Sequence, residues 1–407
     1  MGPLAGVRVL DLSRILAGPW ATQCLADFGA TVWKVEKPGA GDDTRHWGPP
    51  WVRDAQGADT GEAAYYASTN RGKRSIAVDF TKPAGQQLLR ALAMRADVLI
   101  ENFKVGTLAK CRLGWESLHR LNPRLVYCSI SAFGQDGPRK DEAGYDAMIQ
   151  GLSGLMSVTG VPEGEPGAGP VKVGVAVADL ITGLYAVNAI EAALYERELS
   201  GRGQYIDLAL LDTQVAALAN QALNYLVTGK APGRRGTAHP NIVPYQAFAT
   251  KDGYLMLAVG NDRQFADFCR VARRAGLARD AKFATNAARV RHRAALIPQI
   301  DRLCRQKTTA AWIKALAKAG VPCGPINDLA QVFEEPQVKH RKLRFDLPHP
   351  GGGRVPQVRN PVLFSRSALK YRDPPPLLGQ HTDEVLSKEL GVTADELQRL
   401  RADHVIG

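Results

Sequence analysis

The sequence predicts an α/β protein whose larger domain is built on a doubly wound, mostly parallel β-sheet of the Rossmann-like kind. Through the first half, short apolar runs alternate with longer amphipathic stretches, which is typical of a parallel sheet with helices on both faces. At 407 residues the chain exceeds one ordinary domain. A change of composition near residue 229 predicts that a second, smaller α+β domain follows.

Local signals support each element of the first half. Buried strands are predicted by the apolar runs 7–12, 31–36, 75–78, 98–100 and 125–130. Helices are expected over 19–28 and 82–95, because each has a proline in its first turn, and the first is closed by Gly29. The run 171–177 resembles a strand. The apolar spacing beyond it predicts a long helix that ends at Gly201.

The second half contains a different mixture of elements. The stretch 229–236 is rich in Gly and Arg and resembles a linker. Residues 245–259 predict a hairpin around an Asp-Gly turn. Helical patterns then cover 264–275, 296–304, 310–319 and 382–400, with short strands near 355–364. We therefore expect three segments, with boundaries at 1–228, 229–330 and 331–407.

Composition restricts the class of protein. Apolar residues make up 45% of the chain and charged residues 23%, as in ordinary globular proteins. No apolar stretch is long and uninterrupted enough to predict a membrane span, and the six cysteines form no C-x-x-C pair. The histidines show no metal-ligand spacing, so no metal site is expected. We predict a cytoplasmic protein, and its net charge of +12 predicts an anionic partner.

Asp179 is the one carboxylate in the otherwise apolar stretch 173–190. Burying an anion is costly, so its presence there suggests a function. The alternative from position alone is an ordinary first-turn or N-cap aspartate. The sequence lacks the H-E-x-x-H, P-loop, G-x-S-x-G and G-x-G-x-x-G signatures of other sites. Asp179 therefore remains the main catalytic candidate.

Basic and small residues follow several predicted strands. Ligands of doubly wound sheets bind beyond the carboxyl ends of the strands, and Arg and Lys there suit a phosphate-rich ligand. Phe103 could stack on a base. The candidates from this pattern are Arg14, Lys37, Arg71, Lys73, Arg74, Asn102 and Phe103.

At these residues the chain resembles the family III CoA-transferases. The resemblance covers essentially the whole chain. Its motifs are Leu16-Ala-Gly-Pro19, residues 34–42, Asn70-Arg-Gly-Lys-Arg-Ser75, Glu101-Asn-Phe103, Gly144-Tyr-Asp146, residues 151–156, residues 173–179, Gly201-Arg-Gly-Gln204, residues 321–325 and residues 377–383.

The resemblance implies a site and an activity. It implies that Asp179 is the nucleophile, which attacks a CoA thioester to give a mixed anhydride and then an enzyme–CoA thioester. It implies that Ala17, Lys110 and Tyr145 join the strand-end candidates in binding CoA, which is a substrate, with no tightly bound cofactor. It also implies that the C-terminal segment returns to the large domain and that two copies form an interlocked homodimer. Membrane and nucleic-acid partners are not expected.

Further stretches, 41–50, 236–248 and 374–381, are similar to members of the family that act on dicarboxylic acids. This implies succinyl-CoA as donor and an acceptor such as glutarate or hydroxymethylglutarate. The second carboxylate of such an acceptor needs a cation, and Arg45 and His239 are the candidates.

Three alternatives remain open. One is a family member with another acceptor. Leu16 replaces a glutamine of formyl-CoA transferase and no Gly-rich loop lies over 243–261, so oxalate and formate are disfavoured. A second is a 2-methylacyl-CoA racemase, but Tyr145 stands where that branch has its histidine base. The third is a non-catalytic basic protein that binds nucleic acid, for which the sequence shows no supporting motif.

Overall fold

The computed structural model describes residues 1–407, and these form two compact units. The first comprises Met1–Leu155, Lys172–Lys230 and Lys339–Gly407, and the second Met156–Val171 and Ala231–Val338. The second unit thus includes residues 156–171, which the sequence analysis placed in the large domain. They form a small hairpin, β8 (Gly160–Val161) with β9 (Gly169–Pro170), and Arg234 Nε donates to the Val161 carbonyl oxygen over 2.9 Å.

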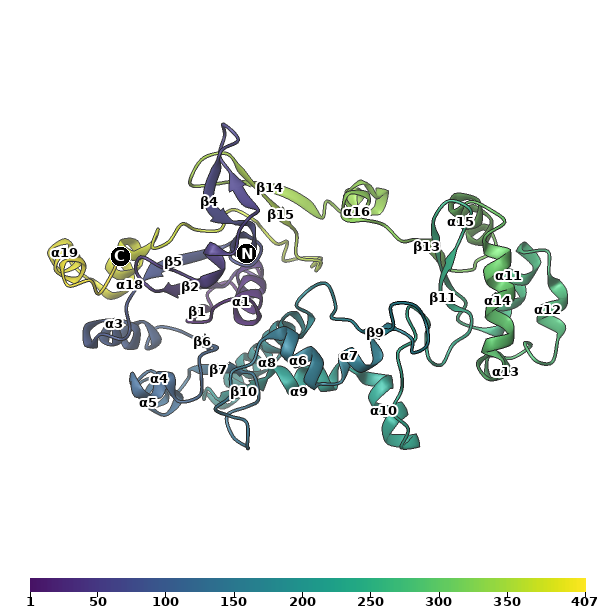
Figure 1. Cartoon of the computed structure of the whole chain (residues 1–407). Coiled ribbons are helices and arrows are strands. Elements are labelled where there is room, and N and C mark those ends of the chain that lie inside the picture. Colours follow the sequence, from purple (N-terminus) through teal and green to yellow (C-terminus); the bar gives the residue numbers. More distant parts are fainter. The chain divides into compact units, whose positions relative to one another are not determined.

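The first unit contains a parallel six-stranded sheet in the order β10-β7-β6-β1-β2-β5 (Figure 1). The strands are β1 (Arg8–Asp11), β2 (Thr31–Glu36), β5 (Lys73–Ala77), β6 (Val98–Glu101), β7 (Val126–Ser131) and β10 (Tyr205–Ala209). Every neighbouring pair is parallel. The predicted doubly wound fold is therefore confirmed. From β1 the chain continues to β2 on one side and later to β6 on the other, so the strand order reverses between β1 and β6.

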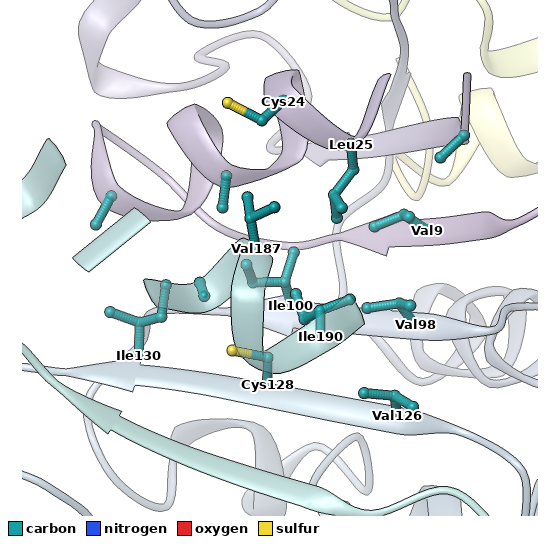
Figure 2. Packing of buried hydrophobic residues seen from close by; sticks show 14 of the residues in the cluster. Val9, Cys24, Leu25, Val98, Ile100, Val126, Cys128, Ile130, Val187 and Ile190 are labelled. Carbon is teal, nitrogen blue, oxygen red and sulfur yellow. The ribbon is translucent and has the colours of Figure 1, made fainter. Parts of the chain in front are cut away.

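Successive side chains along the strands of this sheet pack alternately into two separate hydrophobic cores. Val9 of β1 packs into one and Leu10 into the other, because successive strand residues point to opposite faces. The first core lies under helices α1 (Ala17–Asp27) and α8 (Val177–Ser200). Figure 2 shows Val187 and Ile190 of α8 packed close to the strands of this core.

Helix α8 runs directly along α1. A Cβ atom at Gly183 would lie 2.7 Å from the Ala17 carbonyl oxygen, so glycine permits this close approach. By length and composition α8 could also cross a membrane, but a core helix meets the same criterion. Ala178, Ala186 and Ile190 are buried in the sheet's first core, which places α8 among the core helices.

The second core is covered by helices from two distant parts of the chain. These are α3 (Pro83–Ala93), α5 (Trp115–Leu121), α18 (Thr382–Leu390) and α19 (Ala394–Ala402). The end of the chain is joined to β5, since Gly407 N donates to the Ala77 carbonyl oxygen over 3.2 Å. The predicted single helical pattern over 382–400 is two helices, because Gly391 ends α18 with φ at 72°.

The remaining elements are shorter. In the first unit they are α2 (Ala64–Ala67), α4 (Thr107–Lys110), α6 (Asp146–Leu152), α9 (Leu210–Ala216), α10 (Ala219–Thr228), the 3-10 helix η1 (Asp43–His46), and the hairpins of β3 (Trp51–Arg53) with β4 (Asp59–Ala63) and of β14 (Arg344–Pro348) with β15 (Arg354–Val358). Helix α7 (Leu155–Val158) lies at the boundary of the two units.

The second unit contains the predicted hairpin, formed by β11 (Tyr245–Ala249) and β12 (Tyr254–Ala258) and extended by β13 (Cys323–Pro325). Its helices are α11 (Asp262–Val271), α12 (Ala275–Arg279), α13 (Asn286–Arg291), α14 (Arg293–Cys304), α15 (Thr309–Lys318) and α16 (Leu329–Glu334), and α17 (Pro336–His340) crosses the unit boundary. Phe265, Phe268 and Trp312 fill its own core.

One predicted strand is wrong. Residues 171–177 form no strand, and the helix begins at Val177. The backbone N–H of Val173 donates to the side chain of Gln150 over 2.9 Å instead of to a neighbouring strand. No strand pairs with this apolar run, and Gly174 and Val175 are exposed.

Candidate active site

A pocket of about 170 Å³ lies at the carboxyl edge of the sheet, and we call it the strand-end pocket. Its walls are formed by residues 14–17, 102–105, 130–132, 140, 142–145, Asp179 and Leu210. Residues 14–17 follow β1 and residues 102–105 follow β6. The pocket therefore lies where the strand order reverses, which is the usual ligand position in doubly wound folds.

Asp179 reaches this pocket from the first turn of α8. Its side chain is partly buried. Burial, and then the negative charge of Asp146, raise the pKa of Asp179 to about 7. The helix dipole also favours an aspartate in the first turn of a helix. Asp179 therefore stabilises α8 as an ordinary first-turn aspartate does, whatever its role in catalysis. Near neutral pH this carboxylate is partly protonated, and its ionised form is an unusually basic nucleophile.

The loop after β1 is held in a strained shape beside the pocket. Ile15 has φ at 70°, an unfavourable region for a β-branched residue. Its N–H lies 3.2 Å from the Asp42 carboxylate, which also pairs with the buried Lys34 ammonium over 2.9 Å. Lys34 in turn donates to the Ser13 carbonyl oxygen over 3.1 Å. This buried pair supports a backbone conformation that the loop would not adopt alone.

A second set of contacts joins the two strand ends across the reversal point. The Asn102 side chain accepts from Arg14 N and donates to Arg14 O, both over 2.8 Å. The Arg14 guanidinium lies 5.4 Å from the centre of the Phe103 ring and pairs with Asp43 over 2.9 Å. The rim of the pocket is thus a fixed structure that carries an aromatic face and a cation, both suited to a nucleotide-containing thioester.

Six of the predicted site residues meet at this pocket. They are Arg14, Ala17, Asn102, Phe103, Tyr145 and Asp179. Lys37 and Lys110 do not line it; both are exposed, Lys37 directly after β2 and Lys110 at the end of α4.

The predicted basic residues near β5 have partners inside the protein. Lys73 is fully buried and pairs with Asp11 over 3.2 Å, and burial, reinforced by Lys34, lowers its pKa to about 8. Arg71 is bound by Asp27 over 2.6 Å. Arg74 pairs with Glu384 over 3.4 Å on the surface. The structure therefore gives Arg71 and Lys73 a role in holding the fold instead of free charges for phosphate.

The two predicted acceptor-binding residues, Arg45 and His239, have partners within their own units. Arg45 is buried and ion-paired with Glu36 and Glu62, so it is not a free cation. His239 belongs to the second unit, where its ring lies 5.3 Å from that of Tyr245 and Nδ1 accepts from Asn241 N over 3.1 Å. Burial lowers the pKa of His239, which favours its neutral form.

Three residues near the site were missed. Lys104 and Lys140 line the strand-end pocket, and neither is paired with a carboxylate. Lys104 directly follows the strand-end candidates Asn102 and Phe103, and Lys140 lies in the segment after β7, so the rule that ligands bind after strand ends could have found both. Burial, and then the negative charge of nearby Asp179, raise the pKa of Tyr65 in α2 to about 12. No local signal in the sequence distinguishes Tyr65 from a core tyrosine.

The fold and the site together define a class: a doubly wound α/β protein with a partly buried carboxylate of raised pKa at the carboxyl edge of its sheet. The sequence pattern of CoA-transferase family III matches residues 4–382. The chain belongs to this family, and it is a CoA-transferase whose substrates are acyl-CoA thioesters and carboxylic acids.

Several named proteins are similar to this chain over nearly its full length. A succinate–glutarate CoA-transferase of Agrobacterium fabrum is 51% identical over 386 residues, covering 95% of each chain. A succinyl-CoA:glutarate CoA-transferase of Mus musculus is 45% identical over 406 residues, covering 100% of this chain and 91% of the mouse protein. Among solved structures, a CAIB/BAIF family protein from Brucella suis is 49% identical with a TM-score of 0.83, covering 95% of this chain and 99% of the other.

Proposed function

We propose that this enzyme transfers CoA from succinyl-CoA to glutarate or hydroxymethylglutarate, with Asp179 as the covalent nucleophile. The observation that carries the proposal is the position of Asp179. It lines the strand-end pocket together with Asn102, Phe103 and Tyr145. The names of the relatives from Agrobacterium fabrum and Mus musculus support this choice of donor and acceptor.

The proposed reaction has two half-reactions: CoA is first transferred to Asp179 and then to the acceptor acid. A carboxylate oxygen of Asp179 attacks the thioester carbonyl carbon, the C–S bond breaks, and CoA leaves as a thiolate while a mixed anhydride forms. The thiolate then attacks the aspartyl carbonyl of this anhydride and releases succinate, which leaves an enzyme–CoA thioester. The acceptor acid reverses the two steps and departs as its CoA ester.

The strand-end pocket offers groups for binding the CoA part. Arg14, Lys104 and Lys140 supply positive charge at its wall, and Phe103 supplies an aromatic face. CoA carries several phosphate charges, which such side chains bind as ion pairs. The first turn of α8 adds backbone N–H groups near Asp179, and these favour a developing oxyanion.

The test is an exchange assay with succinyl-CoA and acceptors of graded length: malonate, glutarate, hydroxymethylglutarate, mesaconate and oxalate. We expect glutarate or hydroxymethylglutarate to give the highest kcat/KM, though one methylene changes binding by only about 1–3 kcal/mol. Borohydride added after succinyl-CoA should convert Asp179 to homoserine by reducing the enzyme–CoA thioester. Asp179→Asn should lose exchange and the modification while it keeps its affinity for CoA. An active Asp179→Asn enzyme would refute the covalent role.

We further propose that the enzyme works as a homodimer. Large apolar side chains remain exposed on α8 and α10, including Tyr195, Leu199, Leu226 and Val227. Large exposed apolar side chains on these helices support an interface between protein chains. Light scattering should give about twice the 44.0 kDa of one chain, and Leu226→Asp should shift the mass toward one chain. A monomeric wild type at micromolar concentration would contradict this.

A further inference from the structure

Two buried polar residues of α6, Asp146 and Gln150, hold the segment that leads to Asp179. The Asp146 carboxylate accepts from Ala178 N over 2.8 Å and from Gln150 Nε2 over 2.7 Å. The Gln150 carbonyl oxygen accepts from Val173 N over 2.9 Å. One side chain thus binds each end of the segment 173–178, and the two side chains are bonded to each other.

The other hydrogen bonds of this segment are local, such as those from Lys172 Nζ to the Val173 carbonyl oxygen and from Val177 N to the Val175 carbonyl oxygen. The segment forms no strand, and Gly174 and Val175 are exposed. The N-cap of α8 is Ala176, which has no side-chain acceptor for the free N–H groups of the first turn. Asp146 supplies that acceptor from another helix. Tyr145, the residue before Asp146, lines the strand-end pocket. The Asp146–Gln150 pair therefore connects this part of the pocket wall to the helix turn that carries Asp179.

The arrangement also brings a second negative charge close to Asp179. The titratable groups around Asp179 are Asp146 of α6, its N-cap residue Tyr145, Tyr65 of α2, and Arg14, Lys104, Lys140 and Glu142 at the pocket wall. Asp146 is the charge that acts most on Asp179. When Asp179 attacks a thioester carbonyl, its negative charge leaves with the CoA thiolate. The repulsion from Asp146 is relieved in that step.

We propose that the Asp146–Gln150 pair is the positioning element of this enzyme, which fixes the first turn of α8 and keeps a like charge beside the nucleophile. This inference rests on the proposed function for its effect on turnover, but not for its effect on the titration of Asp179. Gln150 has the positional role alone, whereas Asp146 has both roles.

Two variants separate these roles. Asp146→Asn removes the charge and keeps an oxygen acceptor for Ala178 N, but it loses the acceptor for Gln150 Nε2. Gln150→Met keeps the charge of Asp146 and removes the hydrogen bonds of Gln150 with Val173 N and with the Asp146 carboxylate. The measurements are kcat, KM for succinyl-CoA and the pH profile of kcat/KM, with thermal unfolding as a check of folding. Asp136→Asn, which removes an exposed loop carboxylate, is the matched control.

In the wild type, kcat/KM should rise with pH through about 7, because the ionised Asp179 is the reactive form. Asp146→Asn should move this midpoint to lower pH by about one unit and lower kcat about tenfold. Gln150→Met should lower kcat about tenfold with an unmoved midpoint and an unchanged KM. Asp136→Asn should match the wild type. Wild-type kcat in Gln150→Met, or an unmoved midpoint in Asp146→Asn, would overturn the proposal.

A measurement without turnover keeps the inference separate from the proposed function. Carbon-13 NMR of protein labelled at the aspartate carboxyl carbons, with Asp179→Asn for assignment, gives the titration midpoint of Asp179 directly. A lower midpoint in Asp146→Asn supports the pairing even if no acceptor is turned over, in which case only the proposed function fails. If Asp146→Asn does not fold, kcat of Gln150→Met decides the positional role.

Discussion

The Arg45 guanidinium and the Glu36 carboxylate meet side-on, with Nε to Oε1 and Nη2 to Oε2 both at 2.8 Å. Arg45 Nη1 pairs with the Glu62 carboxylate over 2.9 Å. Arg45 Nη2 also donates to Tyr66 Oη and to the Pro376 carbonyl oxygen. The pair is buried and joins β2, η1 and the C-terminal segment. An arginine with every nitrogen engaged in this way stabilises the fold and has no donor left for a substrate.

Removing Arg45 should therefore reduce stability. Arg45→Ala leaves Glu36 as an uncompensated buried charge, and we expect it to lower the free energy of unfolding by about 3–5 kcal/mol in urea. The control is Arg53→Ala, because Arg53 forms a long, exposed pair with Asp59 at 3.8 Å and should cost less than about 1 kcal/mol. If Arg45→Ala were as stable as the wild type but bound glutarate poorly, Arg45 would be the acceptor's cation after all.

The cations of the strand-end pocket should determine the affinity for the acyl-CoA. Lys140→Glu and Lys104→Glu each replace attraction with repulsion near the expected phosphates, so we expect KM for succinyl-CoA to rise about tenfold in each at low salt. The increase should shrink as salt is added, because these side chains are exposed.

Lys110→Glu tests the competing prediction from the sequence. Lys110 does not line the pocket, so the structure favours a small effect there. Lys314→Glu on α15, in the second unit, is a matched charge reversal far along the chain. A larger rise in KM for Lys110→Glu than for Lys140→Glu would restore the CoA contact that the resemblance implies.

Glu101 should make the protein less stable as pH rises. Burial raises the pKa of Glu101 to about 7, against 4.5 for the ordinary group, although Ser129 and Phe103 N donate to its carboxylate. The charged form is therefore disfavoured in the folded state. The free energy of unfolding should fall by about 3 kcal/mol as the pH rises from about 4.5 to 7. Below pH 4.5 Glu101 is protonated in both states and should contribute no pH dependence.

Glu101→Gln removes this titration. The variant should be closer to the wild type in stability at pH 5 than at pH 8, where it should be the more stable of the two. Urea unfolding at both values measures the difference. The same stability difference at pH 5 and pH 8 would mean that Glu101 titrates normally in the folded protein.

The sequence predicted the strands and most helices of the first unit because their signals are local. The apolar run of β2 and the helix around Pro83 can be read without knowing any partner. The run 171–177 was misread for the same reason, since its apolar character was visible but the absence of a neighbouring strand was not. Lys73 was predicted to bind a phosphate-rich ligand because Asp11, which pairs with its ammonium group, is 62 residues away in the sequence.

By itself the sequence determined the fold class, the family and the candidate nucleophile, because strand periodicity, strand-end motifs and an isolated carboxylate are all properties of neighbouring residues. The tertiary structure decided which cations are free, which are internal ion pairs, and what surrounds Asp179. Those properties depend on groups brought together from far apart, such as Asp146 beside the first turn of α8 and Arg14 beside Asn102. Charge, burial and pKa are set by such neighbours in space, and only the folded chain determines them.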